Sequence, residues 1–297
     1  MNSLDQIRNA LNDINEGCVS LGDNLRNHIF SDINFVNLMP FVPSWVRDAG
    51  NSAESDLSKV NFEKFVSENK NDTTHRFLFL YDCDMLVASL QDRFSMIGGL
   101  VKEFYKNMKF ESSHNLKDFD SATMKISEAY APLFACLNSI FIYLGSSFDL
   151  LTKICYELSC IEDIDFSSYP RLKSRKILFG TFRFKDPFNE KTIFDKPDVI
   201  KRILSIRNRI VHNGSFDFRQ IIYDLKIAKE NYSEITIFFP DMNGTNFDGF
   251  QNRCNFYSSS NQINLTLPNM LIEVLNLISN TISIANRIYP SKKSTNH

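Results

Sequence analysis

Apolar side chains recur at helical spacing over most of the chain. In residues 3–29, for example, Leu4, Ile7, Leu11 and Ile14 lie three or four positions apart, so they share one face of a helix. The same spacing predicts further helices over residues 61–69, 74–108, 121–160, 196–212 and 268–288. We therefore expect a mainly α-helical fold.

Glycine and proline mark where these helices are expected to break. The pair Gly98-Gly99 weakens a helix interior, so it predicts an interruption of the helix over 74–108. Pro132 predicts a kink or a fresh start in the next helix. Downstream of it, residues 133–158 are apolar around most of the helix circumference, which predicts the central helix of the core.

A small β-hairpin or sheet is expected as an insertion before the last helix. Residues 234–239, EITIFF, combine β-branched and aromatic side chains and are followed by a turn at 240–244. Segments 255–257 and 262–267 are the candidate partner strands, whereas 220–229 fits one or two turns of helix. Irregular connections, the last with a short helix, are expected over residues 32–56, 111–120 and 161–195.

The composition is that of an ordinary globular chain. Its 297 residues include 33 Lys and Arg against 35 Asp and Glu, for a net charge of -2. A chain with so little net charge does not coat nucleic acid or anionic membrane by bulk attraction. The hydrophobic fraction of 43 %, with 27 Phe and 10 Tyr, excludes a disordered chain. A function must therefore come from a particular site.

Cysteine usage and hydropathy predict a cytoplasmic protein without a metal or another cofactor. The six cysteines form no CxxC pair and have no histidine at metal-ligand spacing, which argues against structural zinc. The first residues lack the basic and apolar segments of a secretory signal. The most apolar stretch, 131–145, is broken by Asn138 and Ser139, so no membrane span is expected. Free thiols in a reducing compartment fit this pattern.

One segment gathers side chains with the chemistry of a catalytic site. Among five histidines, four have ordinary contexts, such as His75 at a helix start, whereas His212 lies in the polar end of an apolar helix. It is surrounded by Arg207, Asn208, Arg209 and Asn213. A histidine can move a proton near neutral pH, and an arginine presents donors suited to phosphate oxygens. These are the groups needed for attack of an RNA 2′-hydroxyl on the adjacent phosphate, without a metal.

The spacing within this cluster both supports and limits that chemistry. Asn208 and His212 are four positions apart and share a helix face. Arg207 and His212, however, lie about 140° apart around an ideal helix. They converge on one phosphate only if the helix ends before His212, or if two subunits share a cleft across a two-fold axis. A structural alternative is that these residues cap the helix C-terminus of an interaction protein without catalytic activity.

The motif resembles the signature of the HEPN superfamily. It reads Arg207-Asn208-x-x-x-His212 followed by Asn-Gly, where the family has an Arg, a polar residue and a His a few positions later. The resemblance covers a helical domain over 113–290 with an active-site helix at 196–212, and residues 291–297 form a polar tail. The helical region 1–112 is not explained by it.

The resemblance implies a metal-independent endoribonuclease that cleaves single-stranded RNA as a homodimer with a composite site. Arg207 and His212 would be catalytic, and Asn208 their polar helper. Such proteins act in toxin–antitoxin, abortive-infection and antiphage systems, where an inhibitor or trigger protein can be a further partner. The alternative is a HEPN-like module that binds RNA or protein without cleaving. Position 214 is Gly, not the Tyr of toxins silenced by nucleotidylation, so that mode of control is not supported.

RNA-binding or supporting roles are assigned to Arg209 and Asn213 beside the motif residues, and to residues outside the motif. Asp149 can hold Arg207 by a charge-assisted bond, or it can contact Ser146 or solvent instead. A basic run precedes the active-site helix and can either follow an RNA backbone or form a solvated surface. Its members are Arg171, Lys173, Arg175 and Lys176.

Overall fold

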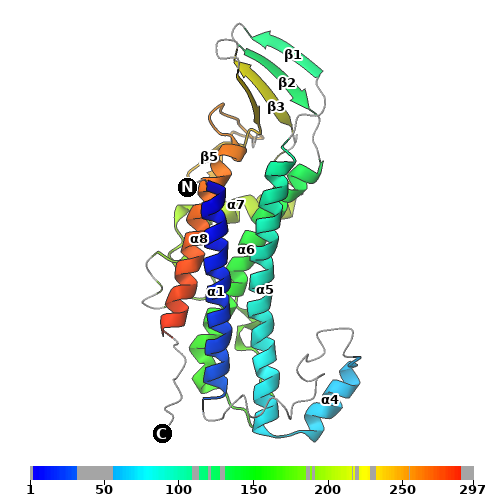
Figure 1. Ribbon diagram of the computed structural model, residues 1–297, viewed down its shortest axis with the longest axis vertical. Coiled ribbons are helices and arrows are strands. Elements are labelled where there is room, and N and C mark those ends of the chain that lie inside the picture. Colours follow the sequence, from blue (N-terminus) through cyan, green and yellow to red (C-terminus); the bar gives the residue numbers. More distant parts are fainter. Residues whose placement is uncertain are drawn as a thin grey trace. The chain divides into compact units, whose positions relative to one another are not determined.

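Helices make up most of the described chain (Figure 1). The computed structural model describes residues 3–31, 56–108, 114–119, 122–127, 131–184, 188, 191–215, 217, 221–227, 232–253 and 255–288. Its helices are α1 (Ser3–Ile29), α4 (Lys59–Glu68), α5 (Asp72–Lys106), α6 (Ala131–Cys160), α7 (Asp198–Asn213) and α8 (Ile263–Ile288). The expectation of a mainly α-helical fold is therefore confirmed. Most of the predicted loop over 32–56 lies outside the described residues.

The chain divides into two compact units. The first contains Met1–Asp13, Arg93–Ser147 and Asn189–Ser279, and the second contains Ile14–Asp92, Phe148–Phe188 and Asn280–His297. The boundaries fall within α1, α5, α6 and α8, so each of these helices contributes residues to both units. The predicted domain boundary, between residues 112 and 113, does not coincide with any boundary between these units.

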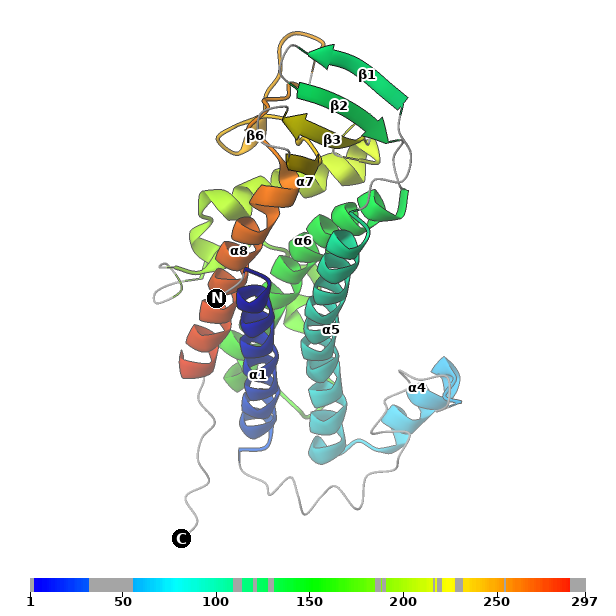
Figure 2. The same ribbon diagram turned by 45° about the horizontal axis from the view of Figure 1, so that its top comes forward.

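The first unit contains a four-stranded antiparallel sheet built from two separate segments. Strands β1 (His114–Phe119) and β2 (Ala122–Ser127) follow α5, whereas β3 (Ile222–Ile227) and β4 (Tyr232–Thr236) follow α7. The strand order is β1-β2-β3-β4, so β2 and β3 join the two hairpins (Figure 1). A second, two-stranded ladder, β5 (Met242–Asn243) and β6 (Asn246–Phe247), contacts α7 through β6 (Figure 2).

Four of the predicted elements differ from the structure, and two of them form strands because of pairing over long sequence distances. Residues 122–127, expected within a helix, form β2, and residues 222–227, expected as helical turns, form β3. Each strand gains its backbone partners from the other, in a register that pairs Ala122 with Ile227. Residues 262–267, expected as a partner strand, pair with the 234–239 segment through one isolated bridge between Phe238 and Gln262, and α8 begins at Ile263. The predicted partner strand at 255–257 is absent from the described residues, because β4 pairs with β3.

The predicted break at Gly98-Gly99 is also wrong, since α5 continues through both glycines. A Cβ atom at Gly98 would lie 3.1 Å from Cδ1 of Leu11, so the glycine allows α1 to approach α5 closely. Packing against α1 thus compensates for the low helix propensity of this position. The fresh start predicted at Pro132 is confirmed, because α6 begins at Ala131.

Helix α6 supplies core residues to both units, as its uniform apolarity predicts. Its residues that are at most 1 % exposed include Leu133, Leu137, Ile140 and Leu144 in the first unit, and Phe148, Leu151 and Leu158 in the second. Among the described residues, one helical segment, Pro132–Asp163, is long and apolar enough to cross a membrane by length and composition alone. Half of its most apolar window is buried, and the core helix of a water-soluble protein meets the same criterion.

The start of α8 is fastened to α5 and to the end of β4. Pro268 lies inside α8 and has no backbone N–H, so it cannot donate to the carbonyl of Asn264 four positions earlier. The hydroxyl of Tyr105 donates to that carbonyl instead, at 2.9 Å. The Asn264 side chain accepts a hydrogen bond from the backbone N–H of Ile237 at 3.0 Å. Asn264 therefore links three elements of the first unit.

Close approach of helices also organises the second unit, where α1 and α5 run side by side (Figure 1). The Gln91 amide donates to Oδ1 of Asn15 at 2.9 Å across this pair. A Cβ atom at Gly17 would lie 2.6 Å from Cγ2 of Ile282, so glycine is required where α8 meets α1. Asn286 of α8 also donates to the Gly17 carbonyl, at 3.1 Å.

Two carboxylates, the buried Glu157 and the partly buried Asp82, hold the segment that follows α6 in the second unit. This segment contains short 3-10 turns at Ile161–Asp163 and Lys173–Lys176, in keeping with the predicted connection. Glu157 is 1 % exposed, and its Oε1 accepts the backbone N–H of Ser174 at 2.6 Å. Asp82 of α5 accepts the hydroxyl of Tyr169 at 2.5 Å. Burial raises the pKa of both carboxyls above the ordinary range.

The bond between Tyr105 and Asn264 can be tested by a double-mutant cycle. We expect Tyr105→Phe to lower the free energy of unfolding by about 1–2 kcal/mol, because a partly buried carbonyl loses its donor. In a Pro268→Ala background the loss should fall below about 0.5 kcal/mol, since the new N–H at position 268 can donate to the same carbonyl. Urea denaturation of the four variants measures both costs. Equal costs in the two backgrounds would contradict this account of the α8 start.

Candidate functional site

Helix α7, which carries the predicted catalytic residues, begins and ends close to the expected positions. It runs from Asp198, directly after Pro197, to Asn213. Gly214 follows in the left-handed region, with φ of 80°, and its N–H donates to the Ile210 carbonyl at 2.8 Å. Glycine suits this conformation, which explains why the helix stops at the Asn-Gly pair.

One face of α7 is buried and the opposite face is exposed. The buried face is apolar and consists of Val199, Ile200, Ile203, Ile206 and Ile210. Asn208, His212 and Asn213 are exposed. Val211 is also exposed, by 51 %, and it lies directly beside His212. The amphipathic pattern therefore places the polar end of the motif in solvent.

Arg207 is positioned by a glycine of α6 and by its neighbour on α7. A Cβ atom at Gly145 would lie 3.1 Å from Cγ of Arg207, so the arginine stem packs directly over the α6 backbone. Its Nη1 donates to Oδ1 of Asn208 at 2.9 Å. Asn208 in turn shares its helix face with His212, one turn later. The arginine is thus directed toward the face that carries the histidine.

The structure excludes one of the two ways in which Arg207 and His212 could converge. The helix does not end before His212, because its last residue is Asn213. The expectation that an early helix end brings them together is therefore wrong, and the Gly214 cap explains why. A cleft shared by two subunits remains a prediction.

Arg209 has a structural environment that sequence reasoning did not anticipate. Its guanidinium lies 4.2 Å from the centre of the Phe247 ring, and it donates to Oδ1 of Asn255. Asn255 donates to the hydroxyl of Tyr257 at 3.0 Å, and Tyr257 donates to Oδ1 of Asp217 at 2.5 Å. Burial and the Asp217 bond raise the pKa of Tyr257. Arg209 thus joins α7 to β6 and to the segment before α8.

Of the other predicted supporting residues, Asn213 is exposed at the end of α7 in the first unit, whereas Asp149 and the basic run lie in the second unit. Asp149 accepts the backbone N–H of Phe179 at 2.8 Å, a partner that the sequence did not indicate, whereas Ser146 donates to the carbonyl of Tyr143. The basic run is fully exposed, which both of its interpretations predict. Its members are Arg171, Lys173, Arg175 and Lys176.

A cavity of about 330 Å³ lies beside α7 in the first unit and was not foreseen. Arg202 lines it and donates to the Gly244 carbonyl at 3.3 Å. Asp241 also lines it, and its carboxylate accepts from the backbone N–H and the hydroxyl of Ser258. The carboxylate of Asp248 completes a mainly polar lining. The residues come from α7, the β5–β6 ladder and the α8 start, so no local sequence signal marks the cavity.

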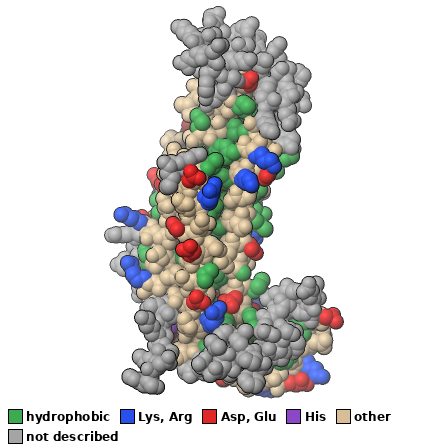
Figure 3. Space-filling view, viewed as in Figure 1, with side chains coloured by type: hydrophobic (Ala, Val, Ile, Leu, Met, Phe, Trp, Pro, Cys, Tyr) green, Lys and Arg blue, Asp and Glu red, His purple; other side chains and the backbone are tan. Residues whose placement is uncertain are grey.

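Charged side chains give no further indication of a ligand. On the face drawn in Figure 3, Lys and Arg are interspersed with Asp and Glu. Within the described ranges, no group of three or more His, Cys, Asp or Glu side chains could hold a metal ion. The described cysteines are free, and Cys18, Cys83 and Cys155 are buried.

Comparisons of the chain with known protein families, curated proteins and solved structures found no match. The HEPN resemblance therefore depends on the motif from Arg207 to Gly214 and on its helical setting. Any functional conclusion must come from the geometry of α7.

The two arginines of the motif are expected to differ sharply in their effect on stability. Arg209→Ala should lower the free energy of unfolding by about 2 kcal/mol, since a cation–π contact and a hydrogen bond are lost together. Arg207→Ala should cost less than about 1 kcal/mol, because its hydrogen bond to Asn208 is exposed. Urea denaturation of both variants measures the difference. Equal costs, or a larger cost for Arg207→Ala, would show that the roles are assigned wrongly.

Proposed function

We propose that the protein is a metal-independent endoribonuclease whose active site is the exposed C-terminal part of α7. One observation carries this proposal: Arg207 donates to Asn208, and Asn208 shares its exposed helix face with His212. Arg207 would supply a phosphate-binding cation and His212 a proton carrier. Arg207 and His212 are the catalytic residues, and Asn208 positions the arginine.

The chemistry is an internal transesterification of single-stranded RNA. His212 accepts the proton of a 2′-hydroxyl as the 2′-oxygen forms a bond to the adjacent phosphorus. Arg207 donates hydrogen bonds to the non-bridging oxygens and stabilises the charge that develops on them. The bond to the 5′-oxygen then breaks, and that oxygen takes up a proton. The products are a 2′,3′-cyclic phosphate and a 5′-hydroxyl.

A homodimer with a composite site completes the proposed arrangement. Within one α7, Arg207 and His212 are about 140° apart. A two-fold axis beside the C-terminal end of α7 would place Arg207 of one copy opposite the histidine of the other. Val211, 51 % exposed beside His212, supplies an apolar contact for such an axis. A role in bacterial antiphage defence or in a toxin system comes from the family resemblance alone.

The experiment is cleavage of a mixed single-stranded RNA pool in EDTA, followed by analysis of the product ends. Wild type should cleave and leave 2′,3′-cyclic phosphates, and His212→Ala and Arg207→Ala should each lose activity at least about a hundredfold. Lys201→Ala is the matched control, because Lys201 is exposed on the first turn of the same helix. Circular dichroism establishes that all variants are folded.

Two other results would count against the proposal. RNA binding by a folded wild type without any cleavage would favour the HEPN-like binding module. A metal-dependent cleavage that is unchanged in His212→Ala would place the active site elsewhere in the chain.

A further inference from the structure

A second cavity, of about 360 Å³, lies in the second unit and takes no part in the proposed cleavage. It is formed by α4, the start of α5 and the segment 167–169. Its walls are mostly apolar, and its volume is at the lower end of the range for small-molecule sites. The lining includes Phe62, Val66, His75 and Tyr169.

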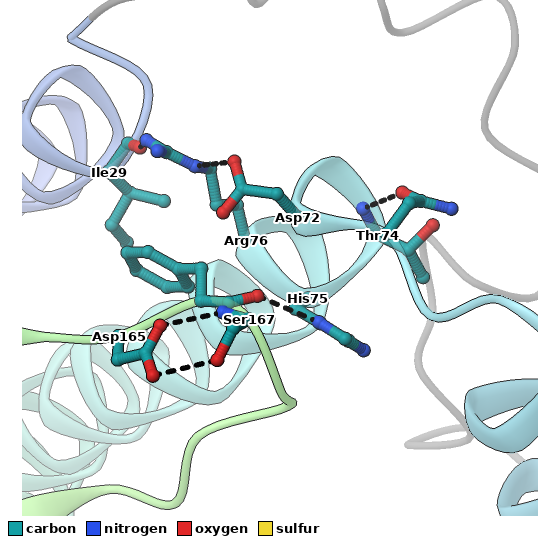
Figure 4. A network of polar contacts seen from close by, with 9 residues as sticks. Ile29, Asp72, Thr74, His75, Arg76, Asp165 and Ser167 are labelled. Atoms are coloured by element: carbon teal, nitrogen blue, oxygen red, sulfur yellow. Dashed lines mark hydrogen bonds and ion pairs between the residues drawn. The ribbon is translucent and has the colours of Figure 1, made fainter.

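His75 gives this cavity one buried polar group. The residue is 2 % exposed, and its Nδ1 lies 2.9 Å from the carbonyl oxygen of Phe166 (Figure 4). A carbonyl oxygen only accepts, so Nδ1 carries the hydrogen, and Nε2 of the neutral ring is then a bare acceptor. In Figure 4 the second ring nitrogen of His75 lies on the side of the ring away from the dashed hydrogen bond. It has no hydrogen-bond partner in the part of the chain that the structure describes.

The surroundings hold the imidazole in this orientation. The guanidinium carbon of Arg76 lies over the Phe166 ring, 4.9 Å from the centre of that ring. Arg76 is bonded to Asp72 at 2.6 Å and to the carbonyl of Ile29, which ties α5 to the end of α1 (Figure 4). The backbone that accepts from His75 is therefore fixed independently of any ligand. Nε2 of His75 is not among the fully buried polar atoms, so a donor can reach it while the ring is held in place.

Two aromatic side chains, Phe62 and Tyr169, line the cavity. The rings of Phe62 and Tyr169 meet edge to face, with 6.1 Å between their centres. The Tyr169 hydroxyl is occupied, since it donates to Asp82 at 2.5 Å. Tyr169 therefore offers an apolar surface and not a second polar group. The cavity combines these aromatic walls with His75, the one buried polar side chain of its lining. The other polar residues that line it are exposed: Glu63, Ser67, Lys70, Ser167 and Ser168.

We propose that this cavity binds a small planar aromatic molecule whose single N–H or O–H group donates to Nε2 of His75. Aromatic walls favour a flat ring, because stacked and edge-on contacts with Phe62 and Tyr169 add to apolar burial. The fixed Nε2 acceptor at the buried end of the lining favours a ligand with a donor over an isostere that lacks it. The site is independent of the endoribonuclease proposal and lies in the other unit.

Indole and 1-methylindole test this proposal, because they differ in the donor and in one methyl group. Isothermal titration calorimetry should show indole binding to the full chain about tenfold more tightly than 1-methylindole. His75→Asn should abolish that preference, since an asparagine amide can still donate to the Phe166 carbonyl but lacks the Nε2 acceptor. Lys64→Ala, an exposed change on α4 outside the cavity, should leave both affinities unchanged.

A second variant keeps the test decisive if His75→Asn is unstable. Val66→Trp should fill the cavity and weaken indole binding at least about tenfold. Absence of indole binding to a folded wild type would overturn the proposal. Equal affinity for indole and 1-methylindole, or unchanged binding to Val66→Trp, would overturn it as well.

Discussion

The burial of one face of α7 is the constraint on which the proposed active site depends. Val199, Ile203, Ile206 and Ile210 follow the spacing of a helix and must turn into the core together. The residues between them are then forced outward, and Asn208 and His212 become exposed as a pair. Gly145 adds the second condition, because a Cβ atom there would lie 3.1 Å from Cγ of Arg207 and the arginine stem would have to shift.

The same constraint explains why the two arginines of the motif differ. Arg207 is directed to the exposed face by Asn208, whereas Arg209 lies under the β5–β6 ladder, against Phe247 and Asn255. They are two positions apart, so they point to different sides of the helix. Arg209 thus contributes to the packing of the fold, and Arg207 remains available for the proposed catalysis.

Helical periodicity predicted most of the fold, and it failed where partners are remote in sequence. The helix over 3–29 and the buried face of α6 follow from local spacing alone. Strand β2 could not be foreseen in this way, because its pairing partner β3 lies about a hundred residues downstream. Gly98 is a similar case. Its effect on α5 depends on Leu11 of α1, which packs against it and is remote in sequence.

In the candidate site, too, local features could be predicted and features that depend on remote segments could not. The exposure of Asn208 and His212 could be predicted from amphipathicity, whereas the structural role of Arg209 depends on segments that only the fold brings near. His75 looked ordinary in the sequence because neither the Phe166 carbonyl nor the aromatic walls of its cavity are local to it. A histidine at a helix start carries no signal of its burial.

Complementation between two inactive variants tests the central claim most directly. Arg207→Ala and His212→Ala proteins, each inactive, are mixed under conditions that exchange subunits, and RNA cleavage is measured in EDTA. If each site takes Arg207 from one copy and His212 from the other, an equal mixture should recover about a quarter of the wild-type activity. No recovery, although mixed dimers are shown to form by mass spectrometry, would contradict a composite site on α7.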